Sequence, residues 1–98
     1  MTLTELEVAR ELQRILWACL AYWNTETLAP EERLVCYSWV VRPHLERFRE
    51  TFHQSKLEEL ARLGFLEKAD TSRGGNRRYY RIPEADRVRW LLQEWNLN

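Results

Sequence analysis

Thr51 to Ile82 reads TFHQSKLEELARLGFLEKADTSRGGNRRYYRI, and the hydrophobic period changes within this stretch. In its first half, apolar residues recur at helical spacing up to Gly64, a residue that readily adopts the left-handed conformation that follows a helix. These apolar residues are Phe52, Leu57, Leu60 and Leu63. Thr51, followed three residues later by Gln54, has the form of a capping box, which marks a helix start. The first half is therefore predicted to be a helix with defined ends.

The second half of the stretch has the composition of a β-hairpin. Residues 65–69 and 78–82 are short runs rich in residues that favour strands. Residues 70–76 separate them with Asp-Thr-Ser-Arg-Gly-Gly-Asn, whose members tolerate turns and positive φ. We expect a hairpin over residues 65–82, anchored by Phe65, Leu66, Tyr80 and Ile82.

Together these motifs resemble the winged helix-turn-helix regulators of the ArsR and MarR type. The resemblance rests on Leu57-x-x-Leu60-x-x-x-Gly64-Phe65-Leu66 and on residues 74–82, Gly-Gly-Asn-Arg-Arg-Tyr-Tyr-Arg-Ile, and the rest of the chain matches only loosely. It implies an α+β, mostly α fold, a winged helix-turn-helix with additional N-terminal and C-terminal helices. In that family the helix before the glycine lies in the DNA major groove, and the hairpin, or wing, touches the backbone or minor groove. Without the resemblance, the same residues indicate a helix and hairpin in some other small α+β domain.

The resemblance assigns DNA contacts to two sets of side chains. The recognition-helix set is His53, Gln54, Ser55, Lys56 and Glu59, and the wing set is Arg73, Arg77, Arg78 and Tyr79. Glutamine can pair with adenine, histidine and lysine can donate to guanine or phosphate, and arginine can fork onto phosphate oxygens. Glu58 and Glu59 oppose this assignment, because carboxylates are costly close to phosphates. The same polar set would also suit a protein partner.

The charge of the chain is unevenly distributed. The formal net charge is zero, but residues 1–34 carry a balance of −3 and residues 35–98 a balance of +3. Six arginines and only two acids lie between Arg73 and Arg89. Such a cluster is often only a solvated surface, but beside a glycine-rich hairpin tip it favours phosphate contact.

The length of 98 residues, with 45% hydrophobic residues, predicts one domain over residues 1–98. Apolar periodicity and caps predict an N-terminal helix over 4–23, starting with Thr4-x-x-Glu7, a helical core over 30–64, and a C-terminal helix over 84–96. Within the core, a strongly apolar helix is expected from Pro30 to Val41, and Pro43 begins a short helix to residue 49.

The turn of the expected helix-turn-helix has a weak sequence signal. No glycine or other turn residue stands near residues 49–52 apart from Thr51, so one continuous helix over 43–63 is an alternative. The apolar positions change phase between Phe52 and Leu57, which favours a break.

Four of the five tryptophans lie on the two expected terminal helices. Tryptophans most often fill cores, yet the four on the expected terminal helices would suit an interface with a second subunit, because aromatic residues are enriched there. These predicted dimer contacts are Trp17, Trp23, Trp90 and Trp95. A homodimer is therefore expected.

The sequence lacks the patterns of an active site. Cys19 and Cys36 have no CxxC spacing and are expected to be buried thiols, and His44 and His53 lack zinc-ligand spacing and are expected at the surface. No phosphate loop and no nucleophile beside a base is visible, so we predict neither an enzyme nor a cofactor or metal site. No apolar run is long enough for a membrane span, and a cytoplasmic location is expected.

These observations lead to two hypotheses of function. The first is a sequence-specific, double-stranded-DNA-binding transcriptional regulator that acts as a dimeric repressor. The alternative is a winged-helix protein–protein interaction module in a replication or chromosome-maintenance assembly. Salt dependence of binding separates them, because DNA binding weakens steeply as salt rises.

Overall fold

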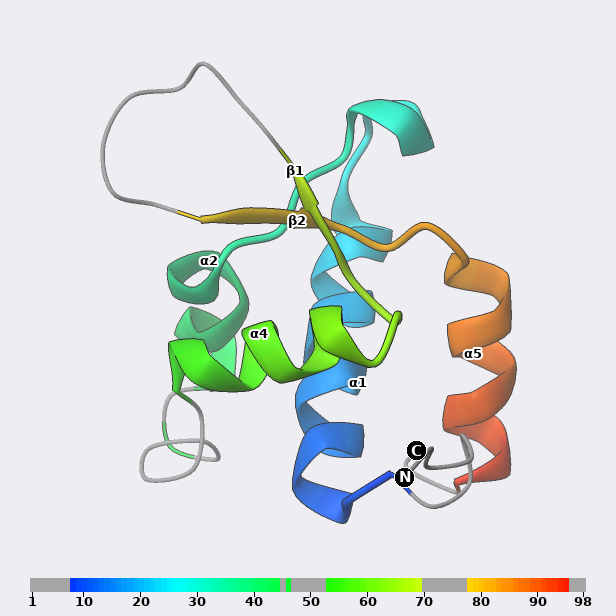
Figure 1. Cartoon of the computed structure of the whole chain (residues 1–98). Helices are drawn as coiled ribbons and strands as arrows, with labels where there is room; N and C mark the ends of the chain where they lie inside the picture. Colours follow the sequence, from blue (N-terminus) through cyan, green and yellow to red (C-terminus); the bar gives the residue numbers. More distant parts are fainter. Residues whose placement is uncertain (1–7, 45, 47–52, 70–77, 96–98) are drawn as a thin grey trace.

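The computed structural model describes residues 8–44, 46, 53–69 and 78–95 (Figure 1). In chain order the elements are α1 (Arg10–Thr25), the 3-10 turn η2 (Pro30–Glu32), α2 (Tyr37–Val41), η3 (Arg42–His44), α4 (Gln54–Arg62), β1 (Glu67–Ala69), β2 (Tyr79–Arg81) and α5 (Ala85–Glu94). Helices predominate, and β1 and β2 form a small antiparallel sheet. The predicted class, α+β and mostly α, is confirmed.

Helix α1 is the centre of the core. Figure 1 shows α4 crossing α1 and α5 running beside it, and α1 contacts α2, α4 and α5. The side chains of α1 that are buried recur every three or four residues, as an amphipathic helix requires, and they include Leu12, Ile15, Leu16, Cys19, Leu20 and Trp23. Because this stripe receives three other helices, their positions are set by α1.

The start of α1 differs from the prediction. The helix begins at Arg10, because Val8 and Ala9 are not helical, and Thr4 lies outside the described residues. The buried Gln13 side chain donates from Nε2 to the carbonyl of Val8 over 2.8 Å. The helix predicted over 4–23 is therefore wrong at residues 8 and 9, and its predicted start at residue 4 lies outside the described residues.

The expected helix from Pro30 to Val41 is also wrong in its middle. Only η2 and α2 are helical there, and Val35 between them is extended and pairs with Tyr80 of β2. The amide of each residue donates to the carbonyl of the other over 2.9 Å. This tertiary pairing, which a β-branched residue favours, overrides the helical periodicity. Helix α2 ends at Val41, as predicted from Pro43.

Helix α4 has the end that the sequence predicts. Gly64 has φ 91°, its amide donates to the carbonyl of Ala61 over 3.1 Å, and the amide of Phe65 donates to Leu60 over 3.0 Å. These two bonds form a Schellman motif. At the other end, His53 is extended, with φ −121° and ψ 156°, so residues 43–63 are not one continuous helix. His53 is the N-cap, and the expected cap Thr51 lies outside the described residues.

The hairpin follows directly from Gly64. Its register places Glu67 opposite Arg81, Lys68 opposite Tyr80 and Ala69 opposite Tyr79. The four predicted anchors are buried, with exposed fractions of 9% or less for Phe65, Leu66, Tyr80 and Ile82. The hairpin is therefore held by its first and last residues, where it meets the helices.

Helix α5 closes the other side of the core. It lies within the predicted 84–96 range, and its buried residues are Val88, Leu91 and Leu92. The ring of Trp95 packs edge-on against that of Phe65, with centroids 6.2 Å apart. No helix of the described residues is long and apolar enough to cross a membrane.

The tryptophans predicted at a dimer interface divide into two groups. Trp23 and Trp95 are only 4% and 7% exposed and pack within the chain's own core, so the interface role predicted for them is wrong. Trp17 is half-buried, with its ring centroid 5.1 Å from that of His44. Trp90 is 54% exposed and is the tryptophan of the set that offers the most surface to a partner.

Candidate nucleic-acid interface

The residues predicted to read DNA occupy different sides of α4. His53 and Ser55 are exposed at its start, whereas Gln54, Lys56 and Glu59 are half-buried. Helical spacing places Ser55, Glu59 and Arg62 in the most outward stripe, with Arg62 exposed near the helix end. The outward surface of α4 therefore carries one acid and one base.

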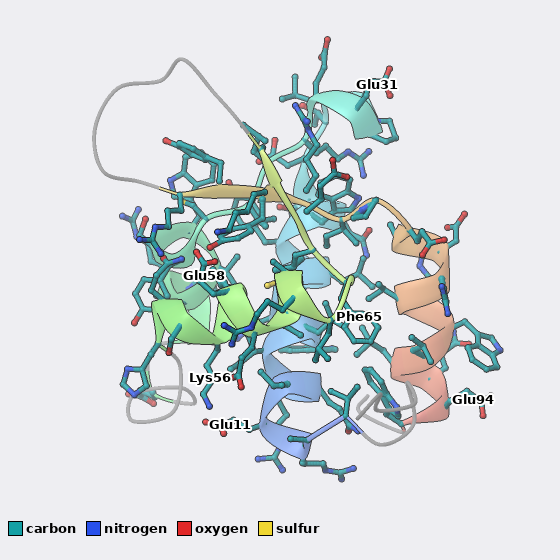
Figure 2. The ribbon with its side chains drawn as sticks, viewed as in Figure 1. Glu11, Glu31, Lys56, Glu58, Phe65 and Glu94 are labelled. Carbon is teal, nitrogen blue, oxygen red and sulfur yellow. The ribbon has the colours of Figure 1, made fainter. Side chains whose placement is uncertain are left out.

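Glu58 joins α4 to the hairpin. Figure 2 shows Glu58 pointing from α4 toward the hairpin and Lys56 pointing toward Glu11 of α1. The Glu58 carboxylate lies 2.9 Å from Lys68 Nζ and 2.9 Å from Arg78 Nη1. The hydroxyl of Tyr80 donates to the same carboxylate over 2.7 Å. Three donors from both hairpin strands therefore converge on one carboxylate of the helix.

The burial of Glu58 makes these contacts stronger than ordinary surface ion pairs. Its side chain is 19% exposed, whereas Lys68 and Arg78 are 66% and 61% exposed. Hydrogen bonds from Lys68 and Tyr80 lower the pKa of Glu58 to about 2, despite the opposing effect of burial. Burial and the bond to Glu58 raise the pKa of Tyr80. The carboxylate is therefore ionised and the phenol is protonated throughout the neutral range.

Gln54 belongs to the same cluster. Its Nε2 donates to the Tyr80 hydroxyl over 2.9 Å, and this hydroxyl in turn donates to Glu58. The Gln54 amide is therefore already engaged with the hairpin in the free protein. Reading a base would require it to leave Tyr80 or to use its remaining donor and its oxygen.

Lys56 links α4 to α1. Its Nζ lies 3.4 Å from a Glu11 carboxylate oxygen and 3.6 Å from a Glu59 oxygen. The lysine that was predicted to contact DNA is thus shared between two acids. This contact and the Glu58 cluster tie α4 to its neighbours on two sides.

The described residues of the predicted wing set differ in their exposure to solvent. Arg78 is exposed, as predicted. Tyr79 is 6% exposed and packs on Trp39, with ring centroids 5.5 Å apart, so its predicted DNA contact is wrong: an aromatic side chain in this position adds to the core instead. Arg73 and Arg77 lie outside the described residues.

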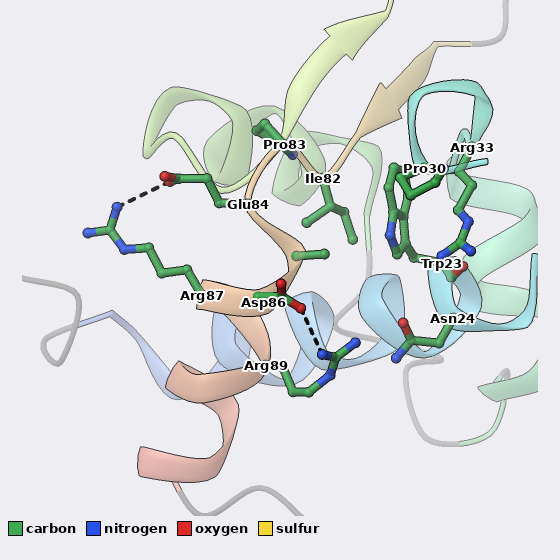
Figure 3. Close-up of a pocket in the computed structure, with 11 residues that line it drawn as sticks. Trp23, Asn24, Pro30, Arg33, Ile82, Pro83, Glu84, Asp86, Arg87 and Arg89 are labelled. Carbon is green, nitrogen blue, oxygen red and sulfur yellow. Dashed lines mark hydrogen bonds and ion pairs between the residues drawn. The ribbon is translucent and has the colours of Figure 1, made fainter.

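An open pocket of about 490 Å³ lies where the end of α1, η2 and the start of α5 meet (Figure 3). Its charged lining consists of Arg33, Glu84, Asp86, Arg87 and Arg89. The dashed lines in Figure 3 mark the ion pairs, 3.1 Å from Glu84 to Arg87 and 2.9 Å from Asp86 to Arg89. Arg33 donates to the carbonyl of Leu28 over 2.8 Å. Because these groups bind one another or the backbone, the lining favours no particular class of ligand.

The thiols and imidazoles form no reactive cluster that the structure describes. Cys19 and Cys36 are free and buried, as predicted, and burial raises the pKa of the Cys19 thiol to about 12. His53 is exposed, but His44 is half-buried against Trp17, so the surface position predicted for His44 is only partly correct. Among the described residues, no three histidine, cysteine or acidic side chains are grouped so that they could hold a metal ion.

Two residues of this surface were not recognised from the sequence. Glu58 was counted as an outward acid, and Lys68 was not assigned any role. The hairpin register places Lys68 opposite Tyr80, and helical spacing places Glu58 beside Gln54. A sequence signal therefore existed, but it required knowing which side of α4 faces the hairpin.

Comparison with known proteins adds no relative. No family model, no curated protein and no solved structure matches this chain.

Proposed function

We propose that this protein is a winged helix-turn-helix transcriptional regulator that binds double-stranded DNA through α4 and the hairpin. The observation that carries the proposal is the junction at Gly64. There α4 passes through a Schellman turn directly into β1, and Glu58 of the helix contacts Lys68 and Arg78 of the hairpin, so the described residues of the two elements lie side by side. A helix beside a basic hairpin can enter a major groove while the hairpin contacts phosphates.

The distribution of charge supports this proposal. Between residues 53 and 81 the chain has seven bases against four acids, whereas the whole chain is neutral. The bases are Lys56, Arg62, Lys68, Arg73, Arg77, Arg78 and Arg81, and the acids are Glu58, Glu59, Glu67 and Asp70. A positive region on a neutral protein attracts a polyanion without making the rest of the molecule adhere to it.

The test is a titration of labelled duplex DNA at several salt concentrations, read by fluorescence anisotropy. The parent should bind, with log affinity falling linearly against log salt. Replacing Arg73, Arg77 and Arg78 together with alanine should flatten that slope by roughly 2 to 3 units, because up to three phosphate contacts are lost. The loss should be equal on all sequences. A folded triple variant with the parent's slope would show that the hairpin does not contact the backbone.

The regulator is proposed to act as a homodimeric repressor that occupies an operator, since two modules provide enough contacts for a specific site. Trp90, 54% exposed on α5, is the candidate for the subunit contact. Sedimentation at micromolar concentration tests this part separately. A monomer of 11.9 kDa would exclude the dimer and leave the DNA contacts of a single module to be tested by titration.

A specific observation favours a second function, a protein-interaction module that uses the same surface. The acids Glu11, Glu58 and Glu59 are interleaved with the bases of α4 and the hairpin, and a mixed-charge surface also suits a protein partner. This alternative predicts no binding to duplex DNA even at low salt. The same titration therefore decides between the two functions.

A further inference from the structure

The carboxylate of Glu58 occupies a position where an anion is bound by three donors. The Lys68 ammonium, the Arg78 guanidinium and the Tyr80 hydroxyl all lie within 2.9 Å of its oxygens. An ammonium, a guanidinium and a hydroxyl are the groups with which proteins commonly bind nucleic-acid phosphates. In the described structure these donors therefore already hold a negatively charged group that belongs to the protein.

The two cations are more accessible than the carboxylate. Lys68 and Arg78 have side chains that are 66% and 61% exposed, against 19% for Glu58. A phosphate that approaches the hairpin from solvent can thus reach both cations from the side opposite Glu58. The long side chains of lysine and arginine can turn from one anion to the other without a change in the backbone.

We propose that Glu58 is an internal competitor for the nucleic-acid phosphate, so that Lys68 and Arg78 exchange between Glu58 in the free protein and the backbone in the complex. This inference depends on the proposed DNA-binding function. When the exchange occurs, the two hairpin cations displace counterions from the DNA. The freed Glu58 carboxylate then attracts about one cation from solution, which lowers the net release of counterions. Glu58 therefore lowers the part of the affinity that does not depend on sequence.

The decisive variant is Glu58→Gln, because its carbonyl oxygen can still accept the Tyr80 hydrogen bond while the charge is removed. Glu84→Gln is the matched control: it makes the same change of net charge on α5, where Glu84 pairs with Arg87 of the same helix. Both variants and the parent are titrated with duplexes of unrelated sequence over a range of salt, and circular dichroism checks that each is folded.

We expect Glu58→Gln to bind every duplex about three- to tenfold more tightly at moderate salt and to steepen the salt slope by about 1 unit, because no carboxylate is then left to take up a cation when Lys68 and Arg78 move to the phosphates. Glu84→Gln should have a clearly smaller effect on both quantities. Equal effects of the two variants, or weaker binding by Glu58→Gln, would overturn the inference, since Glu58 would then act through net charge or by positioning Arg78.

A second variant keeps the test independent of the folding of Glu58→Gln. Replacing Lys68 and Arg78 together with glutamine should flatten the slope by about 1 unit if Glu58 already compensates one of the two cations. A loss of about 1.8 units, the value for two independent contacts, would overturn the inference while leaving DNA binding intact. If the parent and all variants fail to bind DNA at low salt, the proposed function and this inference both fail.

Discussion

Helices α4 and α5 both pack on α1, but they use their charges in different ways. On α5 the ion pairs join neighbours within the same turn, Glu84 with Arg87 and Asp86 with Arg89. On α4 the principal pairs join separate elements: Glu58 binds Lys68 and Arg78 of the hairpin. Pairs of the first kind stabilise a helix by only a few tenths of a kcal/mol.

This contrast shows where a charged residue influences tertiary structure. A pair within one helix leaves the neighbouring elements unaffected, so its removal changes little elsewhere. A half-buried pair between elements restrains the angle at which they meet, and breaking it leaves a carboxylate without compensation. On this basis α4 and the hairpin act as one unit, whereas the ion pairs of α5 leave its neighbours unaffected.

The largest expected loss of stability comes from the tryptophan at the buried end of α5, compared with the exposed tryptophan on the same helix. Trp95→Ala should lower the free energy of unfolding by about 3 to 5 kcal/mol, because Trp95 fills the core beside Phe65. The control Trp90→Ala should change it by less than about 0.5 kcal/mol in the monomer, since Trp90 is exposed in the single chain. Urea denaturation followed by circular dichroism, at a protein concentration too low for dimers, measures both. Similar losses from the two substitutions under these conditions would mean that Trp90 is not exposed in the monomer.

The next effect is the pH dependence of the contact between α4 and the hairpin. The pKa of Glu58 is about 2 in the folded protein, below the ordinary value of 4.5, so the contact stabilises the fold above pH 4.5 and is lost as the pH falls toward 2. Glu58→Gln should reduce stability by about 1 to 2 kcal/mol at pH 7, a value that allows for the exposure of its partners. The difference from the parent should shrink below pH 4.

Urea denaturation at pH 7, 4 and 3 provides the measurement. The matched substitution on α5, Glu84→Gln, should change stability by less than about 0.5 kcal/mol at pH 7, because its pair with Arg87 is exposed. If the Glu58 difference did not depend on pH, its cause would be the shape of the side chain and not its charge.

A smaller loss of stability is expected when the glycine that ends α4 is replaced. Gly64→Ala should lower the free energy of unfolding by about 1 kcal/mol, because φ is 91° at this position, a conformation that alanine adopts with strain. No steric clash adds to this loss, since a Cβ there would meet no atom within 4 Å. Gly64→Asn should cost less, since asparagine tolerates the left-handed region. Equal stability of the parent and both variants in urea denaturation would show that the turn into the hairpin can adopt another conformation.

The smallest effect is expected for the pairs on α5. Arg89→Ala should change the free energy of unfolding by no more than about 0.5 kcal/mol, because both it and Asp86 are exposed. Thermal denaturation at low and high salt measures this value, which should become smaller still as salt increases. A loss above 1 kcal/mol would remove the contrast between α4 and α5.

The elements that were predicted correctly are those with local signals. Gly64 ends α4, Pro43 follows the end of α2, and α5 lies within its predicted range because apolar residues recur at helical spacing. The hairpin anchors were also predicted, since alternation and turn composition are properties of short segments. In each of these cases the deciding interaction lies within a few residues along the chain.

The predictions that failed depend on partners that are distant in sequence. Val35 is extended because it pairs with Tyr80, and α1 starts late because Gln13 binds the carbonyl of Val8. Trp23 and Trp95 were assigned to an interface because nothing in their own helices reveals which stripe the rest of the chain covers. Their burial depends on the packing of α4, α5 and the hairpin around α1.

In the candidate site, too, features set by local sequence were predicted and contacts between distant residues were not. The residue types at the start of α4 and in the hairpin follow from spacing and composition, and a phase change of the apolar positions favoured a break before α4, although its N-cap is His53 and not the predicted Thr51. Which of these side chains remain available to a partner was decided only by tertiary structure: Glu58, Gln54 and Tyr80 form hydrogen bonds between helix and hairpin, and Tyr79 is buried against Trp39. The physical reason is that an ion pair or a buried ring depends on distance in space, whereas the sequence specifies only distance along the chain.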